Sequence, residues 1–92
     1  MNLFWSSGAW DDYVEFQDRD PAMARKINDL IADVRRSPFQ GLGKPEPLRG
    51  PLAGWWSRRI NQEHRLVYRV VGTRGRNQRV EILQCRFHYD RR

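Results

Sequence analysis

Hydrophobic residues recur every three to four positions in two stretches of the N-terminal half, which predicts two helices that each bury one face. The first should follow Ser6-Ser7, whose hydroxyls can cap a helix. The second should follow Asp20-Pro21, because aspartate caps a helix and proline fits its first turn, and should end at Ser37-Pro38. The expected apolar stripes are Trp10, Tyr13 and Val14, with Gln17 at the edge, and Met23, Ile27, Leu30, Ile31 and Val34.

Alternating polar and apolar positions predict strands at 3–5, 56–60, 65–70 and 80–89. These elements predict an α+β fold, an antiparallel sheet with the two N-terminal helices packed on one face, in a single domain over residues 1–92. The residues expected to be buried are Trp10, Ile27, Leu30, Ile31, Ile60, Leu66, Tyr68 and Leu83.

The two faces of the predicted sheet differ in chemistry. In the hairpin, the face with Trp56, Arg58, Ile60, Leu66, Tyr68 and Val70 is largely apolar and suits a core. The opposite face carries Arg59, Arg65 and Arg69, whose forks suit phosphate groups. In the last strand, the core side should hold Leu83, Cys85 and Phe87, and the other side Gln84, Arg86 and His88.

A stretch rich in glycine and proline, residues 39–54, interrupts these patterns. Long loops in compact domains are usually functional or disordered, and apolar residues at Phe39, Leu42, Leu48 and Leu52 argue for order. Pro45 and Pro47 restrict the backbone around Glu46, as would suit a carboxylate held in place to act as a base. The alternative is a solvent-exposed loop glutamate without a role.

Charge narrows the kinds of partner. The chain has 92 residues, a formal net charge of +6 and a pI near 10.4, which favours an anionic partner, nucleic acid first. An acidic protein is a second possibility, and an anionic membrane fits less well because the predicted helices also carry acids. The single cysteine, Cys85, excludes an internal disulfide and favours a reducing compartment. No apolar run approaches ~20 residues and no signal peptide is evident, so we expect a cytoplasmic protein.

The available chemistry fits RNA cleavage without a cofactor. Two histidines and one cysteine far apart in sequence make a poor zinc set, and motifs for phosphate loops or serine nucleophiles are lacking. A tethered carboxylate can take the proton of a ribose 2′-hydroxyl, a histidine can protonate the leaving oxygen, and arginines can stabilise the transition state. His88 shares its predicted face with the arginines, although a strand histidine without a role remains the alternative.

Several blocks of the sequence carry a resemblance. Nearly the whole chain is similar to a YoeB-type (Txe/YoeB) toxin of the RelE-like superfamily. The most specific blocks are Gly43-Lys44-Pro45-Glu46-Pro47-Leu48, Glu63-His64-Arg65-Leu66-Val67-Tyr68 and Cys85-Arg86-Phe87-His88-Tyr89. The resemblance implies a small RelE-like, microbial RNase-like fold. It implies a metal-independent endoribonuclease, or mRNA interferase, that cuts mRNA in the ribosomal A site and is neutralised by a YefM-type antitoxin. Whether the toxin forms a homodimer stays open.

The resemblance also implies roles for individual residues. Glu46 matches the general base, Arg65 the cation of the transition state, His88 the general acid, and Tyr89 a residue that positions the substrate. Lys44 and Arg59 match basic residues near the phosphates. The remaining expected RNA contacts are Arg49, His64 and Arg86.

The chain departs from the family pattern in a few places. Arg49 stands where lysine is common, Phe87 stands where tyrosine is frequent, the turn at 72–78 is longer than usual, and 90–92 extend the C-terminus. None of these departures touches a catalytic position. Two functions of other classes stay under consideration. One is a gyrase poison of the ParE-like branch, which acts by binding. The other is an RNA-binding module without catalysis, which basic and aromatic residues alone would support.

Overall fold

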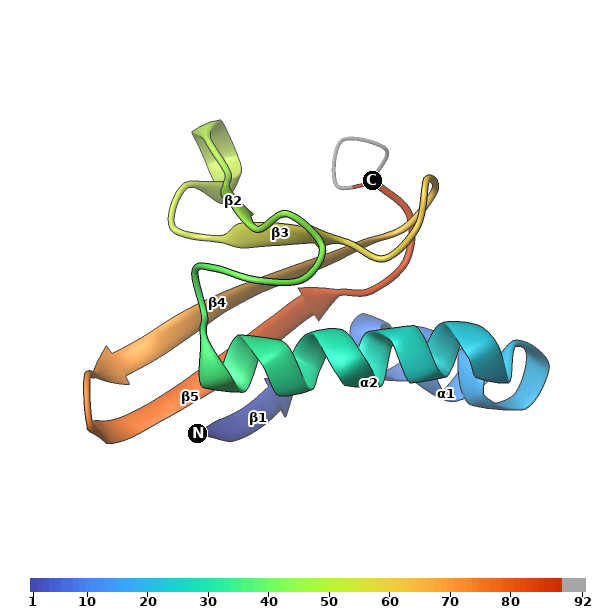
Figure 1. The fold of residues 1–92 in the computed structure, drawn as a ribbon, viewed down its shortest axis with the longest axis horizontal. Coiled ribbons are helices and arrows are strands. Elements are labelled where there is room, and N and C mark those ends of the chain that lie inside the picture. Colours follow the sequence, from blue (N-terminus) through green and yellow to red (C-terminus); the bar gives the residue numbers. More distant parts are fainter. Residues whose placement is uncertain (89–92) are drawn as a thin grey trace.

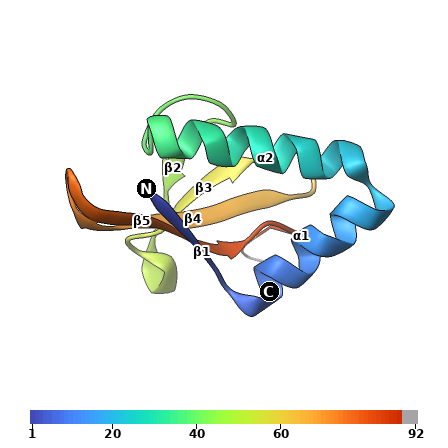
Figure 2. The ribbon, with the colours of Figure 1, turned by 90° about the horizontal axis from the view of Figure 1, so that it is seen from below.

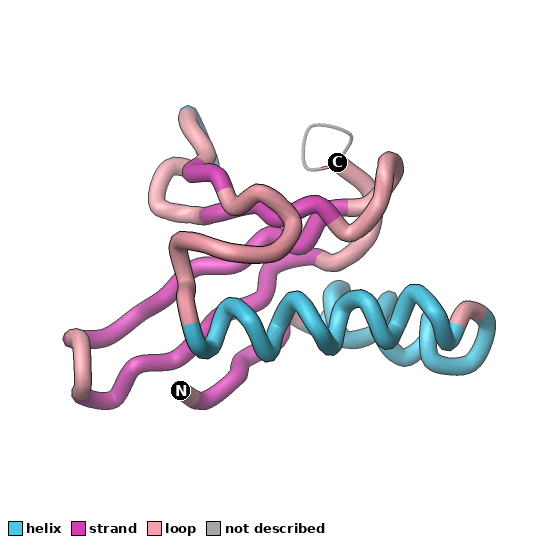
Figure 3. The backbone as a smooth tube through the Cα atoms, viewed as in Figure 1, coloured by secondary structure: helices cyan, strands magenta, loops and turns pink. Residues whose placement is uncertain are grey.

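The computed structural model describes residues 1–88. The elements in chain order are β1 (Asn2–Trp5), α1 (Ser7–Arg19), α2 (Pro21–Arg36), β2 (Glu46–Pro47), the 3₁₀ turn η1 (Gly50–Leu52), β3 (Trp56–Arg59), β4 (Arg65–Thr73) and β5 (Arg76–Gln84). The five strands form one sheet in the order β1-β5-β4-β3-β2. α2 runs across the sheet, and α1 lies beside it near the ends of β1 and β5 (Figures 1, 2 and 3). The predicted α+β class, with both helices on one face, is confirmed.

The sheet is mixed, which corrects the prediction of a fully antiparallel one. β1 pairs in parallel with β5, from Asn2 opposite Arg79 to Trp5 opposite Ile82. The other neighbouring strands pair antiparallel. A parallel pair needs a long crossover, and here both helices and three strands lie between its members. Local alternation in β1 carries no information about the direction of so distant a partner.

Both helices begin at the predicted caps. The Ser6 hydroxyl accepts the Ala9 N–H at 3.1 Å, and Asp20 Oδ1 accepts the Met23 N–H at 3.2 Å. α2 ends before Ser37, as the Ser-Pro pair predicts, and its whole expected stripe is buried. No helix among residues 1–88 combines the length and apolar character needed to cross a membrane.

The buried stripe of α1 is rotated from the predicted one. Ala9 and Phe16 are buried, whereas Trp10 is 48% exposed and Val14 lies at the surface. The small Ala9 allows close approach, since its carbonyl lies 3.4 Å from Cys85 Sγ. Trp10 instead contacts the edge of Trp5 from outside, with ring centroids 5.6 Å apart. The prediction that Trp10 is buried was therefore wrong.

The last strand begins and ends earlier than predicted, at Arg76–Gln84 in place of 80–89, and has the opposite phase. It ends at Gln84, and its core positions are Val80 and Ile82, while Leu83 is only partly buried. Beyond the strand, Cys85 is buried as expected, but Phe87 is exposed. Phe87 adopts a φ of 63°, so the chain turns out of the sheet and the alternation no longer applies. The other predicted core residues, Ile60, Leu66 and Tyr68 among them, are buried.

A buried arginine holds the loop after α2. Arg58 has no exposed surface. All five of its N–H groups donate: Nε to the Tyr68 hydroxyl (3.0 Å), Nη1 to Asp33 Oδ2 (2.6 Å) and the Leu42 carbonyl (3.1 Å), and Nη2 to the carbonyls of Ser37 (2.6 Å) and Gln40 (2.9 Å). This polar network orders the loop. Of the predicted apolar anchors, Leu48 is buried and Leu52 is partly buried, whereas Phe39 and Leu42 are exposed.

Asp33 gives the network a measurable dependence on pH. The Leu42 N–H, Arg58 and Arg36 donate to its carboxylate and lower its pKa from 3.8 to about 2. The folded state therefore releases this proton more readily than the unfolded chain does. The contribution of the Asp33 carboxylate to the free energy of unfolding should be complete above pH 3.8 and should be lost as the pH falls toward about 2.

Urea unfolding across this acid range should show the effect. Asp33→Asn should have a flatter dependence of unfolding free energy on pH than the wild type. Asp29→Asn, which changes an exposed carboxylate of the same helix, should keep the wild-type slope. Equal slopes for Asp33→Asn and the wild type would contradict this account.

Candidate active site

Five of the nine residues predicted for the site line one open groove. The groove has a volume of about 100 Å³ and lies on the face of β3 and β4 that points away from the helices. Its lining residues are Gly43, Lys44, Glu46, Ser57, Arg59, Arg65 and His88. They come from the loop after α2, from β2, β3 and β4, and from the segment after β5. The groove thus combines a carboxylate, three cations and an imidazole.

The strand register explains why four of these side chains share a face. Glu46 on β2 lies opposite Ser57 on β3, and Arg59 on β3 lies opposite Arg65 on β4. Ser57 and Arg59 are two residues apart, so they point to the same side of the sheet. The intervening Arg58 points to the other side, into the core. Glu46, Arg59 and Arg65 therefore surround the position of Ser57, which sequence reasoning missed as part of the groove.

A tight turn delivers Lys44 and Glu46 to the groove. Gly43 has a φ of 78°, and its carbonyl accepts the Arg59 N–H at 2.7 Å. A Cβ at this position would lie 2.8 Å from the Arg59 carbonyl oxygen, so only glycine fits without a shift. Lys44 also has a positive φ, of 53°. Beyond it, Pro47 sits on the edge strand, where a residue without an N–H is tolerated.

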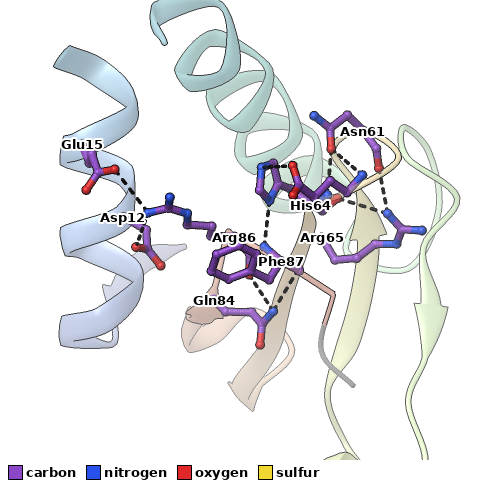
Figure 4. Close-up of polar contacts among 9 residues, drawn as sticks. Asp12, Glu15, Asn61, His64, Arg65, Gln84, Arg86 and Phe87 are labelled. Carbon is purple, nitrogen blue, oxygen red and sulfur yellow. Dashed lines mark hydrogen bonds and ion pairs between the residues drawn. The ribbon is translucent and has the colours of Figure 1, made fainter. Parts of the chain in front are cut away.

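Arg65 is held in place before any substrate binds. Its Nη1 donates to the carbonyls of Asn61 at 2.7 Å and His64 at 3.2 Å. The Asn61 side chain in turn accepts the N–H groups of Glu63 at 2.9 Å and His64 at 2.7 Å, which fixes the turn before β4 (Figure 4). Both of these bonds use Nη1. A cation fixed in this way can stabilise developing negative charge with little reorganisation.

Three arginines expected to contact RNA or to lie on the open face are outside the groove. Arg49 is exposed just before η1, and Arg69 pairs with Glu81 at 2.7 Å. Arg86 reaches α1, where its Nη1 lies 3.4 Å from Asp12 and 3.3 Å from Glu15. The chain has already left the sheet at Arg86, so alternation placed this side chain wrongly.

His64 is 7% exposed and does not line the groove. Its Nδ1 accepts the Phe87 N–H at 2.8 Å, which makes it part of the packing behind the site (Figure 4). His88 is partly buried and lines the groove. Tyr89 lies outside the described residues.

Known proteins are similar to this chain over nearly its whole length. The family described as "YoeB-like toxin of bacterial type II toxin-antitoxin system" matches residues 5–89. Toxin YoeB of Escherichia coli K12 is 52% identical over 89 residues, which cover 97% of this chain and 100% of that protein. The YoeB/ParE toxin from Agrobacterium tumefaciens is 58% identical with a TM-score of 0.91, over 97% of this chain and 100% of that one.

YoeB from Staphylococcus aureus has been solved as a dimer and in a heterotetrameric complex with YefM. In both cases it is 42% identical with a TM-score of 0.85, over 97% of this chain and 98% of that one. A family match over nearly the full length and relatives with about half of their residues identical leave no ambiguity about membership. The chain belongs to the YoeB-like toxins of bacterial type II toxin–antitoxin systems.

Proposed function

We propose that this toxin is an endoribonuclease that cuts mRNA in the ribosomal A site and thereby stops translation. The observation that carries the proposal is the single groove that gathers Glu46, Arg65 and His88 from three separate segments. In this proposal Glu46 is the general base, Arg65 stabilises the transition state, and His88 is the general acid. Tyr89 helps to place the substrate, as the resemblance implies.

The reaction uses only side chains of the groove. The ionised Glu46 removes the proton of the ribose 2′-hydroxyl, and the oxygen attacks the adjacent phosphorus. The bond from phosphorus to the 5′-oxygen breaks, and protonated His88 supplies the proton that this oxygen takes up. Arg65, with Arg59 and Lys44 nearby, neutralises the charge on the phosphorane. The products are a 2′,3′-cyclic phosphate and a 5′-hydroxyl.

The dimensions of the groove favour a substrate that is held by something else. Its volume of about 100 Å³ is well below the roughly 300 Å³ at which pockets begin to enclose a ligand. A groove of this size can hold a phosphate but is too small to enclose a whole nucleotide. The ribosome would present the mRNA backbone in the required geometry, and the net charge of +6 would favour binding to ribosomal RNA.

The partners follow from the same proposal. The S. aureus relative forms a complex with YefM, and we propose a YefM-type antitoxin for this chain too. A homodimer is also proposed, because the same relative has been solved as a dimer. The proposed substrate places the protein in the cytoplasm, where ribosomes are found. Copurification with a co-expressed YefM-type protein would test the antitoxin assignment.

Primer extension on one mRNA, naked or bound to programmed ribosomes, tests the proposed function. We expect a discrete cut in the A site and a rate on ribosomes at least about 100-fold above that on naked RNA, since positioning alone is worth this much. Equal rates on both substrates would contradict the requirement for the ribosome. Because the A. tumefaciens relative is a YoeB/ParE toxin, a gyrase supercoiling assay should accompany primer extension, and we expect no inhibition of gyrase.

A further inference from the structure

The segment that carries His88 is held by a strained turn. Phe87 has a φ of 63°, a left-handed conformation that bulky residues rarely adopt without support. Its carbonyl accepts the Arg65 N–H at 3.1 Å and Gln84 Nε2 at 3.2 Å. Its own N–H donates to His64 Nδ1 at 2.8 Å (Figure 4). The turn before His88 is therefore fixed by hydrogen bonds to both the N–H and the carbonyl of Phe87.

The surroundings of His64 define its protonation state. Nδ1 accepts a hydrogen bond from the Phe87 N–H, so it carries no proton, and the neutral ring holds its proton on Nε2. Nε2 lies 3.3 Å from Glu63 Oε1, which suits that tautomer. The ring packs between Phe16 and Phe87, with centroid separations of 5.5 Å and 5.8 Å. Packing and hydrogen bonds thus leave the imidazole little freedom to rotate.

We infer that His64 is a positioning residue for His88: its neutral imidazole fixes the Phe87 turn and so keeps His88 in the groove with Glu46 and Arg65. The inference rests on the proposed function only for what His88 then does. It explains why His64, predicted as an RNA contact, is buried behind the groove. The side chain acts through the backbone of its neighbour and touches no substrate.

Acid should release this contact. A proton on Nδ1 replaces the acceptor by a donor that faces the donating Phe87 N–H, so the hydrogen bond cannot survive. Burial lowers the pKa of His64 and Arg86 lowers it further, while Glu63, Asp12 and Asp20 oppose this by raising it. The neutral state is therefore favoured in the folded protein. The stability that it contributes is complete above pH 6.5 and decreases as the pH falls below that value.

Two variants separate the hydrogen bond from the packing. His64→Asn places an amide oxygen near the position of Nδ1, so it can still accept the Phe87 N–H but cannot titrate. His64→Phe keeps an aromatic ring between Phe16 and Phe87 but offers no acceptor. Hydrogen exchange of the Phe87 amide and the NMR signals of the His88 ring are measured on the free protein. Single-turnover cleavage is measured on ribosomes between pH 5 and 8.

We expect fast exchange of the Phe87 amide and a shifted His88 ring in His64→Phe, with cleavage slower by roughly 10²-fold, the scale for a displaced catalytic group. His64→Asn should retain protection of the amide, a rate near that of the wild type, and a weaker loss of activity in acid. Wild-type exchange in His64→Phe, or equal slowing in both variants, would overturn the inference. If the wild type cleaves nothing, the proposed function fails, and the exchange and ring signals still decide whether His64 positions His88.

Discussion

Glu46→Gln and His88→Gln should each slow single-turnover cleavage of A-site mRNA by roughly 10²-fold or more, the usual contribution of a general base or acid. Glutamine keeps the shape of Glu46 but cannot take a proton, and at position 88 it stays polar but cannot act as an acid. Glu46 is exposed on the open side of the sheet, so its change should leave folding intact. Ribosome binding should also persist, because other lysines and arginines supply most of the electrostatic attraction.

Arg65→Ala should cause a loss on the same scale by removing a donor to the transition state. This variant is informative because the Arg65 backbone N–H, which holds the Phe87 carbonyl, remains in place. Arg74→Ala in the exposed turn between β4 and β5 is the matched control and should cleave at nearly the wild-type rate. Ribosome pelleting and thermal melting should accompany the kinetics. Near wild-type rates for folded, ribosome-bound Glu46→Gln and His88→Gln would refute the acid–base assignment and favour a toxin that acts by binding alone.

Replacing the buried Arg58 by methionine should have the largest effect on stability. The change would remove the Arg58 hydrogen bonds to the carbonyls of Ser37, Gln40 and Leu42 and would break the ion pair with Asp33. Removing one partner of a buried pair typically costs about 3–5 kcal/mol. That is a large share of the roughly 5–15 kcal/mol that stabilises an ordinary domain. Urea unfolding monitored by tryptophan fluorescence would measure it.

Arg58→Lys should also be strongly destabilising, because an ammonium has three donors where the guanidinium uses five. Arg36→Ala is the control: its side chain pairs with the same Asp33 but is 71% exposed, so little stability should be lost. An unfolding free energy for Arg58→Met within about 0.5 kcal/mol of the wild type, the range of ordinary surface changes, would show that the network is not structural.

Local signals in the sequence predicted local structure well. Ser6, Asp20 and Pro21 set the helix starts, and the regular spacing in α2 identified its buried face. Alternation in the hairpin predicted that Arg59 and Arg65 share a face, and the register confirms it. These features depend on residues within a few positions of each other, where spacing and side-chain chemistry determine the outcome.

The sequence-based predictions were wrong where the position of a residue depends on contacts with distant parts of the chain. Trp10 lies at the surface because the small Ala9 makes the close contact with Cys85. The turn at Phe87 contains no glycine, so the sequence gives no sign of its positive φ. The predicted last strand was therefore extended beyond Gln84, and Arg86 was placed on the wrong face of the sheet. The role of Arg58 in ordering the loop could not be seen from the sequence, because its partners lie 10 to 25 positions away.

The structure likewise places some of the residues predicted for the candidate site in the groove and others outside it. The resemblance supplied the roles of Glu46, Arg65 and His88, and the structure brings these three into one groove. It does not bring Arg49, His64 or Arg86 there. Charge alone could not separate residues that line the groove from those that do not. In the sequence, an arginine that pairs with α1 cannot be distinguished from one that faces a phosphate. Burial and hydrogen bonds make the distinction.

The chemical ends of the RNA fragments test the central claim most directly. Cleaved mRNA from ribosomes programmed in vitro can be recovered, and the ends at the cut can be identified by mass spectrometry. Attack by the 2′-hydroxyl, with Glu46 as base and His88 as acid, predicts a 2′,3′-cyclic phosphate on the upstream fragment and a 5′-hydroxyl on the downstream one. A 3′-hydroxyl paired with a 5′-phosphate, or uncut mRNA on inhibited ribosomes, would contradict it.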